Sequence, residues 1–89
     1  MENRGFMTEE AKQLAAFILK RIRKPDLSID ENTLLVSSGL VDSMALGDVL
    51  LTLEDLTQRR IPPGAVKPKD LDTIALMFET AQRVGRQRK

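Results

Sequence analysis

Three stretches of this chain repeat their apolar residues with the period of an α-helix. They span about 8–24, 43–58 and 72–84, and no stretch alternates apolar and polar residues for long enough to suggest a strand. The 89 residues are enough for one domain. We therefore expect an all-α fold, a small antiparallel bundle of three main helices, with a short helix between Pro62 and Lys69 and a long ordered loop between the first two helices.

Residue types at the ends of these stretches predict where the helices begin and end. Thr8 should cap the first helix, and Pro25 should stop it. Asp42 should cap the second helix, and Asp72 or Thr73 the third. The faces expected in the core are Ala11, Leu14, Ala15, Ile18, Leu19 and Ile22 in the first helix, Leu46, Val49, Leu50, Leu53 and Leu56 in the second, and Ile74, Met77, Phe78 and Ala81, extended by Val84, in the third.

The connection between the first two helices, residues 25–41, is too apolar for a floppy linker. Structureless loops of this length are uncommon inside compact domains and are often functional. Gly39 lies near its end, where a positive φ or a tight approach is expected. Four large apolar residues should pack over the helices: Leu27, Ile29, Leu34 and Leu35.

Composition excludes several classes of function. The chain contains neither cysteine nor histidine, so disulfides, thiol chemistry, the usual general base and the commonest metal ligand are all missing. A Ser-His-Asp hydrolase and an ordinary zinc site are thereby excluded. We expect a protein that is not an enzyme, with no catalytic residue and no metal.

Charge and hydropathy argue against nucleic acid and membrane partners. The net charge is only +1, and no window reaches the roughly 18 apolar residues of a membrane span or resembles a signal peptide. We expect the basic residues at the end of the first helix to be a solvated end: Lys20, Arg21, Arg23 and Lys24. The expected protein is a cytoplasmic monomer with a flexible N-terminus (1–7), a folded body (8–84) and a basic tail (85–89).

One polar dipeptide, Asp42-Ser43, interrupts an apolar run in the middle of the chain. At 100° per residue, four residues that follow should share one sector of the second helix, opposite its core: Met44, Asp48, Leu51 and Asp55. Exposed apolar side chains flanked by carboxylates, just beyond a serine at the start of a helix, indicate a docking surface. The dipeptide is either only a helix cap or the site of a covalent attachment on Ser43.

The run SGLVDSM, followed by an amphipathic helix, resembles the modification site of the acyl and peptidyl carrier proteins. The resemblance covers roughly residues 8–84. Members of that family are helical bundles of about this size, in which the serine of an Asp-Ser-Leu or Asp-Ser-Met motif receives 4′-phosphopantetheine. The resemblance implies that Ser43 carries this arm, that Asp42 completes the motif, and that an acyl or aminoacyl group is held as a thioester. The implied partners are a phosphopantetheinyl transferase, an acyl- or amino acid-activating ligase and a downstream acyl-accepting enzyme.

The chain departs from the carriers of fatty acid synthesis, which are strongly acidic along the second helix. Ala45 and Gly47 occupy positions near the site that could have carried charge. Gly47 also indicates close packing or a closely approaching partner, because glycine inside a helix costs about 1 kcal/mol relative to alanine. The charges in this region are three acids and then two arginines: Asp48, Glu54, Asp55, Arg59 and Arg60.

The LVDSM run looks like that of the D-alanyl and other aminoacyl carrier proteins, or of stand-alone peptidyl carriers. It favours a specialised amino acid or secondary-metabolite pathway over fatty acid synthesis. Two alternatives remain open. One is a small helical interaction or regulatory domain without a prosthetic group, and the other is a carrier-like domain that is never loaded.

Overall fold

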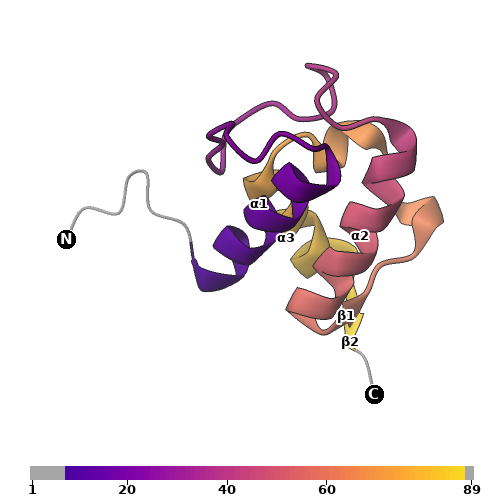
Figure 1. Ribbon diagram of the computed structural model, residues 1–89. Coiled ribbons are helices and arrows are strands. Elements are labelled where there is room, and N and C mark those ends of the chain that lie inside the picture. The colour runs from indigo at the N-terminus through magenta and orange to yellow at the C-terminus, as the bar shows by residue number, and fades with distance from the viewer. Residues whose placement is uncertain (1–7, 88–89) are drawn as a thin grey trace.

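The computed structural model describes residues 8–87, so the expected flexible segment 1–7 lies outside the described residues. Three α-helices surround one core (Figure 1). The loop between α1 and α2 lies at one end of the molecule, and a small sheet lies at the other. The elements in chain order are α1 (Glu9–Arg21), α2 (Ser43–Thr57), β1 (Arg59–Arg60), the 3₁₀ turns η1 (Pro63–Ala65) and η2 (Pro68–Leu71), α3 (Ile74–Val84) and β2 (Arg86–Gln87).

All three helices begin at the residues predicted to cap them. The Thr8 hydroxyl accepts a hydrogen bond from the Ala11 N–H at 3.1 Å. The Asp42 carboxylate accepts one from the Ala45 N–H at 2.8 Å. For α3 the cap is Thr73, whose hydroxyl accepts at 3.0 Å, and not Asp72. Each cap satisfies one of the N–H groups that a helix start leaves without an internal partner.

Helix α1 ends at Arg21, three residues earlier than expected, and Pro25 is not what stops it. Arg23 adopts a left-handed conformation with φ 64°, and its N–H donates to the Lys20 carbonyl at 3.1 Å. The N–H of Lys24 donates to the Leu19 carbonyl at 2.9 Å. These two bonds form the left-handed C-terminal closure that usually employs glycine.

The core confirms most of the predicted helix faces and corrects the face of α2. Leu19 in α1, Ile22 directly after it, and Phe78 and Val84 in α3 are only partly buried against the core. In α2 the predicted Leu46, Leu50 and Leu56 are also only partly buried. Two neighbouring stripes of this helix are apolar, so the sequence pattern alone cannot select the one that faces α1 and α3. The residues of α2 that are fully buried are Ala45, Val49 and Leu53.

The loop between α1 and α2 divides its apolar residues between core and solvent. Ile29 and Leu35 are buried as predicted, and Val41 joins them. Leu27 and Leu34 are 37% and 53% exposed, so the expectation that all four apolar residues pack over the helices is half right.

A two-stranded sheet, which the sequence did not predict, joins the end of α2 to the chain after α3. Arg59 pairs with Gln87, and Arg60 with Arg86, in antiparallel register. Gly85 is required at the entry to β2, because a Cβ there would collide with the Ala81 carbonyl oxygen. The chain is therefore mostly helical with a small sheet rather than all-α. The residues expected to begin a basic tail, 85–87, belong to the folded body, and 88–89 lie outside the described residues.

Candidate functional site

Ser43 is the first residue of α2, and its side chain is exposed. Asp42 before it has an extended backbone, with φ −85° and ψ 178°. Its carboxylate accepts from the Ala45 N–H and its carbonyl from the Leu46 N–H, both at 2.8 Å. The start of the helix is thus held by two hydrogen bonds, and Ser43 stands at a defined position with solvent access.

The chain immediately before this serine forms a closed turn. The Val41 N–H donates to the Leu35 carbonyl at 2.9 Å, and the Ser38 hydroxyl donates to the Leu34 carbonyl at 2.6 Å. Gly39 has φ +85°, which confirms the expected positive φ and explains why glycine is suited to this position.

Asp72 anchors this turn to the start of α3, a role that the sequence analysis missed. One oxygen of its carboxylate, Oδ1, accepts from the N–H groups of three consecutive residues, Leu35, Val36 and Ser37, at 3.2, 2.8 and 2.9 Å. The pKa of the Asp72 carboxyl is lowered from its ordinary value of 3.8, chiefly because the Ser37 N–H donates to it, which outweighs the opposing effect of desolvation. The only sequence signal was an aspartate beside a threonine that already served as the helix cap.

A second backbone contact ties the same loop to α3. The Ala75 N–H, in the first turn of α3, donates to the Glu31 carbonyl at 3.0 Å. The loop before Ser43 is therefore held at two points along its length by one helix start.

The four residues predicted to form a docking surface are all exposed: Met44, Asp48, Leu51 and Asp55. Met44 is 78% exposed and Leu51 is 62% exposed. These are the highest exposures among the large apolar side chains of residues 8–87. The structure therefore places them as the helical period predicts, and we call Met44, Gly47 and Leu51 together the open face of α2.

One carboxylate of the predicted surface already has a partner within the chain. Arg21 Nε, at the end of α1, donates to Asp48 Oδ2 at 2.8 Å. Arg21 is therefore not part of a solvated helix end as expected, because the end of α1 lies beside the second turn of α2, which nothing local in the sequence indicates. The acidic character expected beside Ser43 is reduced by this ion pair.

The two small residues of α2 have different environments. Ala45 is only 3% exposed, so the expectation that this position could have carried a charge is wrong. Gly47 is exposed, and a Cβ built on it would meet no atom of its surroundings within 4 Å. Close packing within the chain therefore does not explain Gly47.

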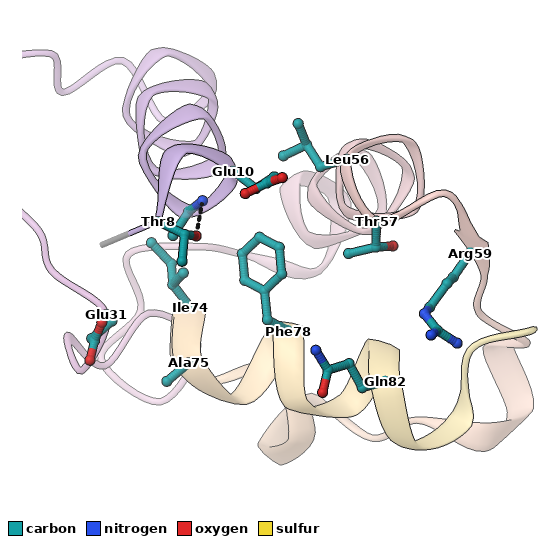
Figure 2. A pocket seen from close by; sticks show the side chains of 11 residues that line it. Thr8, Glu10, Glu31, Leu56, Thr57, Arg59, Ile74, Ala75, Phe78 and Gln82 are labelled. Atoms are coloured by element: carbon teal, nitrogen blue, oxygen red, sulfur yellow. Dashed lines mark hydrogen bonds between the residues drawn. The ribbon is translucent and has the colours of Figure 1, made fainter. Parts of the chain in front are cut away.

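A groove of about 450 Å³ lies at the other end of α2, between the start of α1 and α3 (Figure 2). The Phe78 ring stands in the middle of it, with Arg59 at one end. Leu56, on its wall, lies about 20 Å along the helix from Ser43 at 1.5 Å per residue. The groove is thus separate from the serine, and no sequence pattern predicted it. Its lining residues are Thr8, Glu10, Ala11, Glu31, Leu56, Thr57, Arg59, Ile74, Ala75, Phe78 and Gln82.

Residues 8–87 contain no cluster of three or more acidic, histidine or cysteine side chains with the arrangement of a metal site. In the same part of the chain, no helix combines the length and apolar character needed to cross a membrane.

Comparisons with known proteins return nothing for this chain: no protein-family model, no curated protein and no solved structure matches it. The likeness to carrier proteins is therefore one of motif and residue arrangement.

Proposed function

We propose that this chain is a carrier protein that bears a 4′-phosphopantetheine arm on Ser43. The arm would hold an acyl or aminoacyl group as a thioester, and the domain would present it to partner enzymes of a specialised amino acid or secondary-metabolite pathway. The observation that carries the proposal is the setting of the serine. Ser43 is exposed at the first position of α2, between a loop anchored by Asp72 and a helix face with two exposed apolar side chains.

The residues around Ser43 fit a phosphodiester. A helix N-terminus favours an anion, because its first N–H groups and the helix dipole point toward it. The Asp42 carboxylate accepts a hydrogen bond from the Ala45 N–H at 2.8 Å, so the residue before the serine caps the helix. When bound, the arm supplies the thiol that forms the thioester, a group that this cysteine-free chain lacks.

The chain's own contribution is to position the attachment point and to offer a surface. The hydrogen bonds of Asp42 and Asp72 set where the serine stands, and the open face of α2 gives a partner enzyme something to recognise. With neither histidine nor cysteine in the sequence, acid-base and thiol chemistry would come from the partners and the arm.

The cargo we favour is an aminoacyl group, because the surface beside Ser43 is more apolar than acidic. Asp48 is paired with Arg21, and Met44 and Leu51 are exposed. A ligase that reads apolar contacts should charge the modified protein with little dependence on salt, since screening at 0.15 M acts over about 8 Å and weakens mainly encounters between many charges. Efficient charging with fatty acids that falls steeply with salt would overturn this preference for the cargo.

The test of attachment is the intact mass of the protein after incubation with coenzyme A and a broad-specificity phosphopantetheinyl transferase. The wild-type chain should gain one phosphopantetheinyl group, and Ser43→Ala should gain none. Ser28→Ala is the matched control, because Ser28 is also exposed but lies in the loop, 15 residues before the first residue of α2, and this variant should be modified normally. An adduct on Ser43→Ala would place the attachment elsewhere.

The alternative function is that of a small helical interaction or regulatory domain without a prosthetic group. The exposed pair Met44 and Leu51 supports it equally, because an apolar helix face can bind a partner directly. A wild-type chain that takes no adduct, beside a known carrier that the same transferase modifies, would favour this alternative or a carrier-like domain that is never loaded.

A further inference from the structure

Gly47 has no structural reason to be glycine in the isolated protein. Gly39 has a positive φ of +85°, and a Cβ on Gly85 would collide with the Ala81 carbonyl oxygen, so both of those positions call for glycine. Gly47 instead lies inside α2 with ordinary helical backbone, and a Cβ built on it meets nothing within 4 Å. Glycine at such a position weakens a helix relative to alanine.

The position of Gly47 relates it to the serine and to the open face. Residues three and four apart are neighbours on a helix surface, about 5–6 Å between their Cβ positions. Gly47 is four residues after Ser43, three after Met44 and four before Leu51. It therefore forms a gap between the exposed side chains of Met44 and Leu51, where the backbone of α2 is open to an approaching group.

The charge beside this gap is already balanced within the chain. Asp48, the next residue, accepts from Arg21 at 2.8 Å. Helix α2 contains no lysine or arginine along its 15 residues, so no cation projects from the helix beside Gly47. A side chain that fills the gap meets apolar neighbours and the Arg21–Asp48 ion pair, whose opposite charges offset each other, which favours an uncharged apolar occupant over a basic one.

We propose that Gly47 is where an uncharged apolar side chain of the phosphopantetheinyl transferase packs against the backbone of α2. This inference rests on the proposed function. An enzyme that transfers a group to the Ser43 hydroxyl must cover the first turns of α2, and Gly47 lies one turn away on the same side. A methyl group at this position occupies the gap, so it strengthens the free helix and obstructs the complex.

The test compares stability and modification kinetics for Gly47→Ala. The variant should unfold at a higher urea concentration than the wild type, yet its KM as a substrate of a broad-specificity phosphopantetheinyl transferase should rise on the order of tenfold, as expected for an overpacked contact. Its kcat should not change, because Ser43 and its cap are untouched. Gln13→Ala is the control: it changes an exposed position of α1 to the better helix former, and it should leave KM unaltered.

Each outcome bears on a different claim. A Gly47→Ala variant with the wild-type KM would overturn this inference and leave the carrier assignment intact. A wild-type chain that takes no adduct would overturn the proposed function, and this inference with it.

Discussion

The chain on the two sides of Ser43 is built in opposite ways. On the N-terminal side, residues 35–41 are closed by backbone hydrogen bonds and fastened to α3 by Asp72, and Leu35 and Val41 are buried. On the C-terminal side, the exposed face of α2 presents Met44 and Leu51 with most of their surface in solvent. One side is held in place by the protein's own contacts, and the large apolar side chains on the other side are not covered by them.

This difference shows how a small domain can make one residue both well placed and accessible. Backbone hydrogen bonds and buried side chains on one side restrict where Ser43 stands, while the lack of packing on the other side keeps its hydroxyl within reach. A site packed on both sides would be equally well placed but closed to an enzyme. Substitutions that alter one side at a time test this difference.

The largest effect is expected from emptying the buried part of the anchored side. Leu35 is 0% exposed, so Leu35→Ala should lower the free energy of unfolding by about 2–5 kcal/mol, through lost burial and the cavity left behind. Its neighbour Leu34 is 53% exposed, and Leu34→Ala should change stability by no more than about 0.5 kcal/mol. Urea unfolding measures the free energy of unfolding of both variants. Equal losses of free energy in the two would mean that this loop is not anchored as described.

Removing the Asp72 anchor should have the next largest effect. Asp72→Ala leaves the Val36 and Ser37 N–H groups without their acceptor, whereas the Leu35 N–H still donates to the backbone carbonyl of residue 72, at 2.7 Å in the wild type. Hydrogen bonds to a charged group contribute about 1.5–3 kcal/mol, so a loss in this range is expected at neutral pH. Asp72→Asn keeps an oxygen at Oδ1 and should lose less. Both are measured by urea unfolding at pH 7.

The pH dependence separates the charge of Asp72 from its hydrogen bonds. Because the folded-state pKa of Asp72 is lowered, its charge stabilises the fold at pH values above its ordinary 3.8, and this contribution is lost as the pH falls through the lowered pKa. The stability difference between wild type and Asp72→Asn should therefore shrink on going from pH 7 to pH 3. A difference that grows with acidity would contradict this assignment.

A smaller effect is expected at the boundary between the two sides. Asp42→Ala removes the cap of α2 and should cost about 1 kcal/mol. Ser43→Ala should leave stability and helical circular dichroism nearly unchanged, because Asp42 still accepts from the Ala45 N–H at 2.8 Å. If Ser43→Ala proved the more destabilising of the two, Asp42 would not be the cap on which α2 depends.

The smallest effect on stability, and the most direct test of the open face, comes from Met44→Ala and Leu51→Ala. Both residues are mostly exposed, so each change should alter the free energy of unfolding by no more than about 0.5 kcal/mol. Under the proposed function, each should also slow modification of Ser43 by the transferase. Leu53, two residues after Leu51, is 0% exposed and provides the contrast: Leu53→Ala should cost about 2–5 kcal/mol. A Leu51→Ala variant as unstable as Leu53→Ala would place Leu51 in the core.

Local chemistry was sufficient to predict the parts of the fold and site that depend on neighbours in sequence. Thr8 and Asp42 cap the helices as expected, Gly39 takes its positive φ, and the four residues expected to face away from the core do so. Each of these features depends on groups within a few residues, or on the helical period, so a pattern of residue types contains the necessary information.

The sequence by itself thus determined the helices, their starts and the place of Ser43 at the head of α2. Only the tertiary structure decided that Asp72 holds the loop 36 residues before it and that Arg21 pairs with Asp48. It also decided that residues 59–60 form a two-stranded sheet with residues 86–87. In α2, it decided that Ala45 rather than Leu46 faces the core. These outcomes join groups far apart in the chain, or select between two equally apolar stripes of one helix. They depend on how the helices pack, which no short stretch of sequence specifies.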